Sequence, residues 1–153
     1  MNNIDTLFHY AADFRNGIDT AKRNGLFDFD YNMCHFPYGC CGDTADLLGQ
    51  YFINNGIHPD YVCGCYYYGA DARFQSHAWL EFENILIDIS ADQFREKERF
   101  LYYSVPVYVG PIDNFHKLFE ADNRRKAYYL KNMAPESMRI RLQKLYGIIV
   151  ESI

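Results

Sequence analysis

The chain has 153 residues, of which 49% are hydrophobic and 18% aromatic, a composition that suits a single domain over residues 1–153 and excludes disordered, collagen-like or low-complexity material. Its formal net charge of −5 argues against binding to nucleic acid, which needs a broad basic face. No apolar stretch approaches the roughly 18 residues of a membrane span, and the start of the chain lacks the basic and apolar regions of a signal peptide, so we expect a cytoplasmic protein without membrane contact.

Two helices are predicted in the first third of the chain. Apolar residues recur at helical spacing over residues 4–21, and Asn24-Gly25 predicts the end of this helix. A loop follows over residues 26–42. The second helix is expected over residues 43–53, before Asn55-Gly56.

The cysteines are candidates for chemistry. Their odd number, without a secretion signal, favours reduced thiols over a disulfide framework: Cys34, Cys40, Cys41, Cys63 and Cys65. Cys40 and Cys41 directly precede the second helix, where unpaired backbone N–H groups and the helix dipole favour a thiolate. Cys41 shares the helical face of Ala45, Leu48 and Phe52, which we expect to pack on the sheet. We therefore favour Cys41 over Cys40 as a nucleophile.

The middle of the chain reads as an antiparallel sheet. The aromatic segment 61–68 predicts a strand, and residues 76–82 and 85–89 predict a hairpin closed by Glu83-Asn84. A further strand is expected over residues 101–109, confined to an edge of the sheet because it contains a proline.

The hairpin brings a histidine and a carboxylate to one face. With a two-residue loop, Phe82 faces Ile85 and Trp79 faces Asp88, so His77, Trp79 and Asp88 share a face. His77 and Asp88 become diagonal neighbours about 7–8 Å apart at Cα, within reach of an imidazole–carboxylate hydrogen bond. A buried carboxylate is costly without a partner, so we expect a cation or strong donor beside Asp88. The reserve carboxylate is Asp92.

Two helices are predicted to end the chain, over residues 114–131 and from Pro135 onward. Helices bracketing an antiparallel sheet make the predicted fold α+β. Residues 121–153 carry seven Lys/Arg against three Asp/Glu, whereas residues 1–120 carry eight against 17. This basic C-terminal segment is a candidate site for an acidic partner, although such charges commonly form only a solvated helix face.

Cys41, His77 and Asp88 are the groups that a cysteine hydrolase or acyltransferase needs. Cys41 would supply the nucleophile, His77 would take its proton and return one to the leaving group, and Asp88 would orient the imidazole. Trp79, on the same strand face, would wall the site or shield a thioester. We expect no cofactor and no metal.

These motifs resemble the papain/transglutaminase-like superfamily, and in particular small bacterial transglutaminase-like proteins. The residues that carry the resemblance are Gly39-Cys40-Cys41, Ser76-His77-Ala78-Trp79-Leu80-Glu81 and Ile87-Asp88-Ile89-Ser90-Ala91-Asp92-Gln93-Phe94, and the matching core covers residues 36–94. The resemblance implies a nucleophile-bearing helix packed on an antiparallel sheet. It also implies a thioester route: hydrolysis of a protein, peptide or small amide first, as a thiol peptidase, amidase or deamidase, and acyl transfer to an amine second.

The oxyanion donor is left open by the sequence. Papain-type enzymes place a glutamine before the cysteine, and no such glutamine is evident here. Gln75, Asn32 and the backbone N–H of Cys41 are the substitutes, and Cys40, Trp79 and Asp92 are further candidates to line the site.

Two readings without catalysis compete. A binding module would use an aromatic surface drawn from Tyr66-Tyr67-Tyr68, Trp79 and Tyr102-Tyr103, although aromatic residues in small domains are more often core. A zinc site would draw on the cysteines with His35 and His77, but the C-x₂₋₄-C knuckle of structural zinc is missing. The chain lacks the Gly-rich phosphate loop with Lys-Ser/Thr, which argues against nucleotide hydrolysis, and acetyl-CoA-dependent transfer is suggested only by fold analogy.

Overall fold

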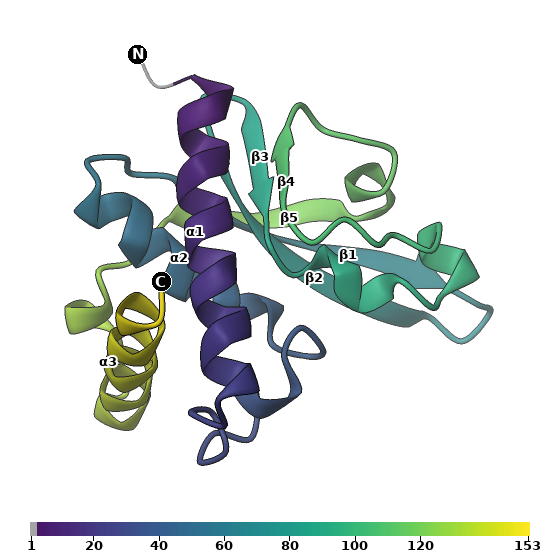
Figure 1. The fold of residues 1–153 in the computed structure, drawn as a ribbon. Helices are drawn as coiled ribbons and strands as arrows, with labels where there is room; N and C mark the ends of the chain where they lie inside the picture. The colour runs from purple at the N-terminus through teal and green to yellow at the C-terminus, as the bar shows by residue number, and fades with distance from the viewer. Residues whose placement is uncertain (1–2) are drawn as a thin grey trace.

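Three helices lie together on one side of a five-stranded antiparallel sheet, in an arrangement that confirms the predicted α+β class (Figure 1). The structure is a computed structural model that describes residues 3–153. The start of the chain, where a signal peptide was considered, therefore lies partly outside the described residues. Within the described residues no helix is both long and apolar enough to cross a membrane.

The helices follow the predicted apolar patterns. Helix α1 (Ile4–Arg23) starts where the Asn3 side chain accepts a hydrogen bond from the Thr6 N–H, and it ends at Asn24. Helix α2 (Cys41–Asn54) begins at Cys41 and not at Asp43 as predicted. Helix α3 (Glu136–Glu151) follows Pro135 and buries Leu142, Leu145 and Ile149.

The sheet has the strand order β4-β3-β2-β1-β5. Its strands are β1 (Asp60–Tyr68), β2 (Arg73–Phe82), β3 (Ile85–Asp88), β4 (Tyr108–Gly110) and β5 (Glu120–Lys126). The predicted hairpin register is confirmed, because Phe82 pairs with Ile85 and Leu80 with Ile87. The long β1–β2 hairpin extends away from the helices (Figure 1).

The helix predicted over residues 114–131 is wrong. Those residues form a short 3₁₀ helix (His116–Leu118) and then β5, an edge strand that pairs with β1. β5 is polar and mostly exposed, so it has none of the apolar alternation that predicts a strand. Backbone hydrogen bonds to β1 and the cross-strand ion pair between Lys126 and Asp60 stabilise this strand. Both contacts join residues distant in the sequence, so a local sequence pattern does not predict them.

The strand predicted over residues 101–109 is also mostly wrong. Only Tyr108–Gly110 pairs with β3, at the edge that Pro106 predicted. Leu101 and Tyr102 have positive φ angles, which end any extended run at the start of that segment.

Two cores lie on the two faces of the sheet. On the helix side, residues such as Phe14, Leu48 and Leu142 pack with Leu80 and Ile87. On the other side Trp79 of β2 packs with aromatic residues of the segment between β3 and β5: Phe94, Phe100, Phe115 and Phe119. β3 ends at Asp88, which is buried.

Candidate active site

His77 and Asp88 form a buried hydrogen-bonded pair. The Nε2 of His77 lies 2.7 Å from Oδ2 of Asp88, and both side chains are essentially inaccessible to solvent. Burial alone would lower the pKa of His77, but the Asp88 carboxylate raises it to about 10. Burial alone would raise the pKa of Asp88, and the neighbouring histidines bring it well below its usual range instead. The hydrogen-bond donor expected beside the buried Asp88 carboxylate is therefore present, and it is His77.

Cys41 is the first residue of α2. Burial acts to raise the pKa of the thiol, but the adjacent imidazole of His77 and the backbone N–H of Ala78 lower it below the ordinary value. Because Asp88 holds Nε2 of His77, Nδ1 is the nitrogen left to face the thiol. Cys41 as a residue is partly exposed.

Cys40 has the opposite environment. It is 2% exposed, and burial raises the pKa of its thiol to about 12. Its sulfur accepts a hydrogen bond from the Thr44 hydroxyl at 3.7 Å. Of the two adjacent cysteines, only Cys41 therefore has the access and ionisation that a nucleophile needs.

His116 is a second histidine on Asp88, and sequence reasoning missed it. Its Nε2 lies 2.7 Å from the same Oδ2 of Asp88, and its Nδ1 lies 2.6 Å from Oδ1 of Asp113. Burial would lower the pKa of His116, but the two carboxylates raise it. The sequence held one signal for this contact, since a buried Asp88 carboxylate needs hydrogen-bond donors. The helix predicted over residues 114–131 did not direct His116 toward Asp88.

Gln93 was also missed as a site residue. Its Nε2 donates to the Ser90 carbonyl at 3.2 Å and lies 3.4 Å from Nδ1 of His77. Its Oε1 accepts the Gly39 N–H at 3.4 Å, so the side chain joins the loop before α2 to the catalytic histidine candidate. The other predicted oxyanion donors lie elsewhere: Gln75 bonds to the carbonyl of Ser76, and Asn32 bonds to Asp43.

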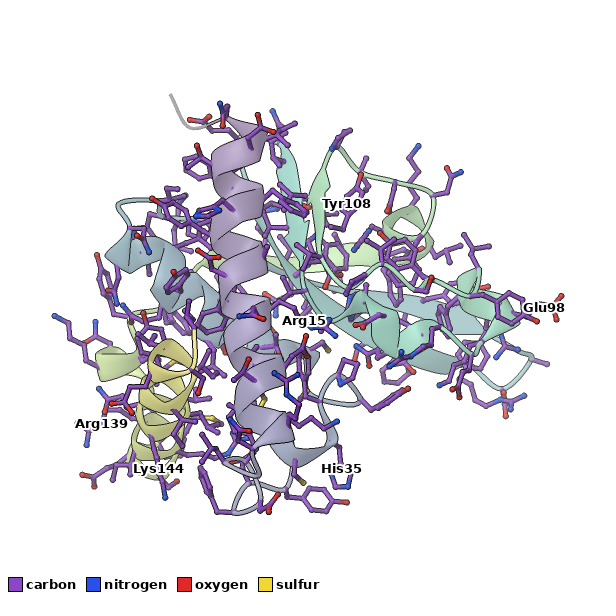
Figure 2. All side chains as sticks on the ribbon, viewed as in Figure 1. Arg15, His35, Glu98, Tyr108, Arg139 and Lys144 are labelled. Carbon is purple, nitrogen blue, oxygen red and sulfur yellow. The ribbon has the colours of Figure 1, made fainter. Side chains whose placement is uncertain are left out.

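Trp79 and Asp92 have supporting positions. Trp79 is 2% exposed, packs 5.8 Å from His77 between ring centroids, and donates its indole N–H to Glu81. Asp92 does not approach His77, because it forms a buried bidentate pair with Arg15, which projects from α1 toward the strands (Figure 2).

One group within residues 3–153 has the composition of a metal site. Ligand atoms of His77, Asp88 and His116 all lie within 4.8 Å of one another. Both histidine nitrogens are 2.7 Å from one carboxylate oxygen, however, and that is the length of a charge-assisted hydrogen bond. Hydrogen bonding accounts for this cluster, and the cysteines of the described part of the chain form no comparable group.

Two cavities adjoin the N-terminus of α2. One, of about 320 Å³, is lined by residues before Cys41, including Tyr31, Tyr38 and Gly39. The other, of about 630 Å³, is lined by residues after it, including Gly42 and Tyr61. Cys41 itself lines neither of these two cavities.

The basic C-terminal segment has its charges largely matched within the chain. Arg124 pairs with Glu81, Arg125 with Asp46 and Lys126 with Asp60. Further along, Arg139 pairs with Glu136, and Arg141 with Asp30 and Asp43. Five of the seven basic side chains of this segment therefore pair with carboxylates of the same chain.

Comparison of the chain with protein-family models, with curated proteins and with solved structures found no match.

Proposed function

We propose that the chain is a cysteine-dependent hydrolase of amide or acyl substrates on a papain/transglutaminase-like fold, with Cys41, His77 and Asp88 as its triad. One observation carries the proposal. The pKa of a partly exposed cysteine at a helix N-terminus is lowered by an imidazole whose Nε2 is held by a buried carboxylate at 2.7 Å. A lowered pKa for the thiol and a raised pKa for the imidazole favour a thiolate–imidazolium pair.

The reaction follows from these positions. The thiolate of Cys41 attacks the carbonyl carbon, a C–S bond forms, and the carbonyl oxygen becomes negative. As the C–N bond breaks, His77 gives its Nδ1 proton to the leaving amine and a thioester remains. His77 then takes a proton from water, which attacks the thioester and releases the acid and the thiolate.

The oxyanion would be stabilised by two kinds of donor. The backbone N–H of Cys41 belongs to the unpaired first turn of α2, where the helix dipole also favours negative charge. The second amide hydrogen of Gln93 has no acceptor at Nδ1 of His77, 3.4 Å away, because Nδ1 carries a proton in the thiolate–imidazolium pair. It is then free to donate to a substrate oxygen.

The first test measures alkylation by iodoacetamide at each cysteine between pH 4 and 9, mapped by mass spectrometry. We expect Cys41 to react well below the ordinary thiol pKa of about 8.5, while buried Cys40 in the same molecule serves as the matched control. His77→Ala should abolish the low-pH reactivity. Ordinary titration of Cys41 in the native protein would contradict the proposal.

The second test follows acylation with p-nitrophenyl acetate. We expect a burst of nitrophenol from the native protein and from Cys40→Ala, and none from Cys41→Ala. Asp88→Asn should lower the rate by roughly 10⁴-fold, as loss of the orienting carboxylate does in other triads. A burst that survives Cys41→Ala would disprove the assigned nucleophile, and recovery of an amide product on adding a primary amine would favour acyl transfer over hydrolysis.

A further inference from the structure

We propose that His116 is a positioning residue of this site, a permanently charged imidazolium that shares Asp88 with His77 and thereby sets how tightly His77 holds its proton. The proposal deepens the proposed function, since it assigns a regulator to the acid–base group on which that function rests. It does not place His116 in contact with substrate.

Hydrogen-bond counting gives His116 its charge. Its Nε2 faces Asp88 Oδ2 at 2.7 Å and its Nδ1 faces Asp113 Oδ1 at 2.6 Å. An ionised carboxylate only accepts hydrogen bonds, so both ring nitrogens must carry hydrogen. The backbone N–H of His116 also donates to Asp113 Oδ1, at 2.9 Å, which fixes the carboxylate in place.

The surroundings of His116 make this charge effective. The ring is 0% exposed, lies between Trp79 and Tyr108 with centroids 5.2 and 5.6 Å away, and contacts Phe115. Figure 2 marks Tyr108, which lies on the edge strand β4. Electrostatic interactions are stronger in such an apolar environment than in water, and water cannot replace the ring as a donor.

The titratable groups that face His116 come from every neighbouring element. They are Asp88 from β3, His77 from β2, Tyr108 from β4, and Asp113 with Tyr103 from the segments that flank β4. The Tyr103 hydroxyl donates to the second oxygen of Asp113 at 2.8 Å. Two carboxylates therefore enclose one imidazolium, and only one of those carboxylates reaches His77.

Sharing Asp88 has a consequence for His77. If Asp88 faced His77 alone, the buried carboxylate would hold the imidazolium so strongly that its proton would be hard to give to a leaving amine. The cation of His116, with its ring centroid 6.2 Å from that of His77, offsets part of the Asp88 charge. The same cation also favours the thiolate of Cys41.

The test is an NMR titration of the histidine rings in Cys41→Ala, where the thiol cannot contribute. We expect the His116 ring to keep the chemical shifts of an imidazolium between pH 5 and 9. His116→Gln keeps a side-chain donor but removes the charge, and it should raise the pKa of His77 by about one to two pH units at this separation. His9→Gln, on the exposed face of α1, is the matched control and should change nothing at His77.

Two further measurements keep the inference testable if His116→Gln folds poorly. Asp113→Asn leaves the ring in place but removes one carboxylate, and it should lower the pKa of His116. In the native background, His116→Gln should move the low-pH onset of Cys41 alkylation upward. Near-UV and far-UV circular dichroism establish that each variant is folded.

The outcomes separate this inference from the proposed function. A native Cys41 that lacks low-pH reactivity, with His116 still charged and still controlling the His77 titration, would sink the hydrolase and leave the role of His116 standing. A reactive Cys41 together with an unchanged His77 titration in His116→Gln would overturn the inference alone. A His116 ring that titrates near the ordinary value would overturn it as well.

Discussion

Two adjacent cysteines have opposite environments because successive side chains at the start of a helix project about 100° apart around its axis. Cys40 is buried in the core with its thiol pKa raised to about 12, whereas His77 lowers the thiol pKa of Cys41. Helical phase favours Cys41, which is in register with the buried Ala45, Leu48 and Phe52, but Thr44 and Leu47, in register with Cys40, are buried as well. Helical phase alone does not predict the imidazole of His77, which lowers the pKa of the Cys41 thiol.

At the residue scale, Gln93 can be tested as an oxyanion donor by comparing two reactions of one thiol. Acylation by a p-nitrophenyl ester passes through an oxyanion, whereas alkylation by iodoacetamide does not. We expect Gln93→Met, which keeps the size of the side chain, to slow acylation by about 10²–10³-fold and to leave alkylation nearly unchanged.

The contrary result for Gln93 is equally clear. Equal slowing of both reactions would mean that the amide only orients His77 or the Gly39 loop, which it also contacts. Gln75→Met is the matched control, because Gln75 lies on β2 but bonds only to the neighbouring Ser76 carbonyl.

At the element scale, a buried arginine ties α1 to the turn that follows β3. Arg15 donates to both oxygens of Asp92 and to the carbonyls of Ile89 and Pro106, at 2.9 to 3.0 Å. The same turn, Ala91–Phe94, carries Gln93. The register of α1 therefore helps to set the position of a proposed donor in the site.

Removal of Arg15 should be costly because it strands a buried carboxylate. We expect Arg15→Met to lower the free energy of unfolding by about 3–5 kcal/mol, measured by urea denaturation. Arg139→Met is the matched control, since its pair with Glu136 is far more exposed, and it should cost less than about 1 kcal/mol. Both arginines are marked in Figure 2. Similar losses in the two variants would show that the Arg15–Asp92 pair does not anchor the turn.

The elements also show which parts of the fold a sequence can predict. Helices α1, α2 and α3 and the β2–β3 hairpin follow apolar periodicity and a two-residue loop, both of which are local. β5 forms on a polar segment through pairing with β1, a contact distant in sequence. The same error hid His116, because its approach to Asp88 depends on the path of the chain between β4 and β5.

At the scale of the whole molecule, the buried charges couple stability to pH. In the unfolded chain a histidine loses its proton near pH 6.5, whereas the folded His77 keeps it to about pH 10 and the pKa of His116 is also raised. Raised pKa values mean that the stabilisation is complete below pH 6.5 and is lost as the pH rises through the folded values. The lowered pKa of Cys41 acts in the opposite direction, since an ionised thiol stabilises the fold as the pH rises toward the unfolded thiol value of about 8.5.

These opposing effects predict a difference between two proteins. In Cys41→Ala the thiol contribution is absent, so the free energy of unfolding should fall between pH 6.5 and 8.5 by about 1.4 kcal/mol per pH unit for each histidine that stays protonated. The native protein should show a shallower decline over the same interval, because loss of the Cys41 proton in the folded state offsets one histidine. Urea denaturation at several pH values measures both slopes, with Cys40→Ala as the control that should match the native slope. Equal slopes in the native and Cys41→Ala proteins would mean that Cys41 is un-ionised in the folded state. That result would contradict the proposed reaction, which depends on the Cys41 thiolate.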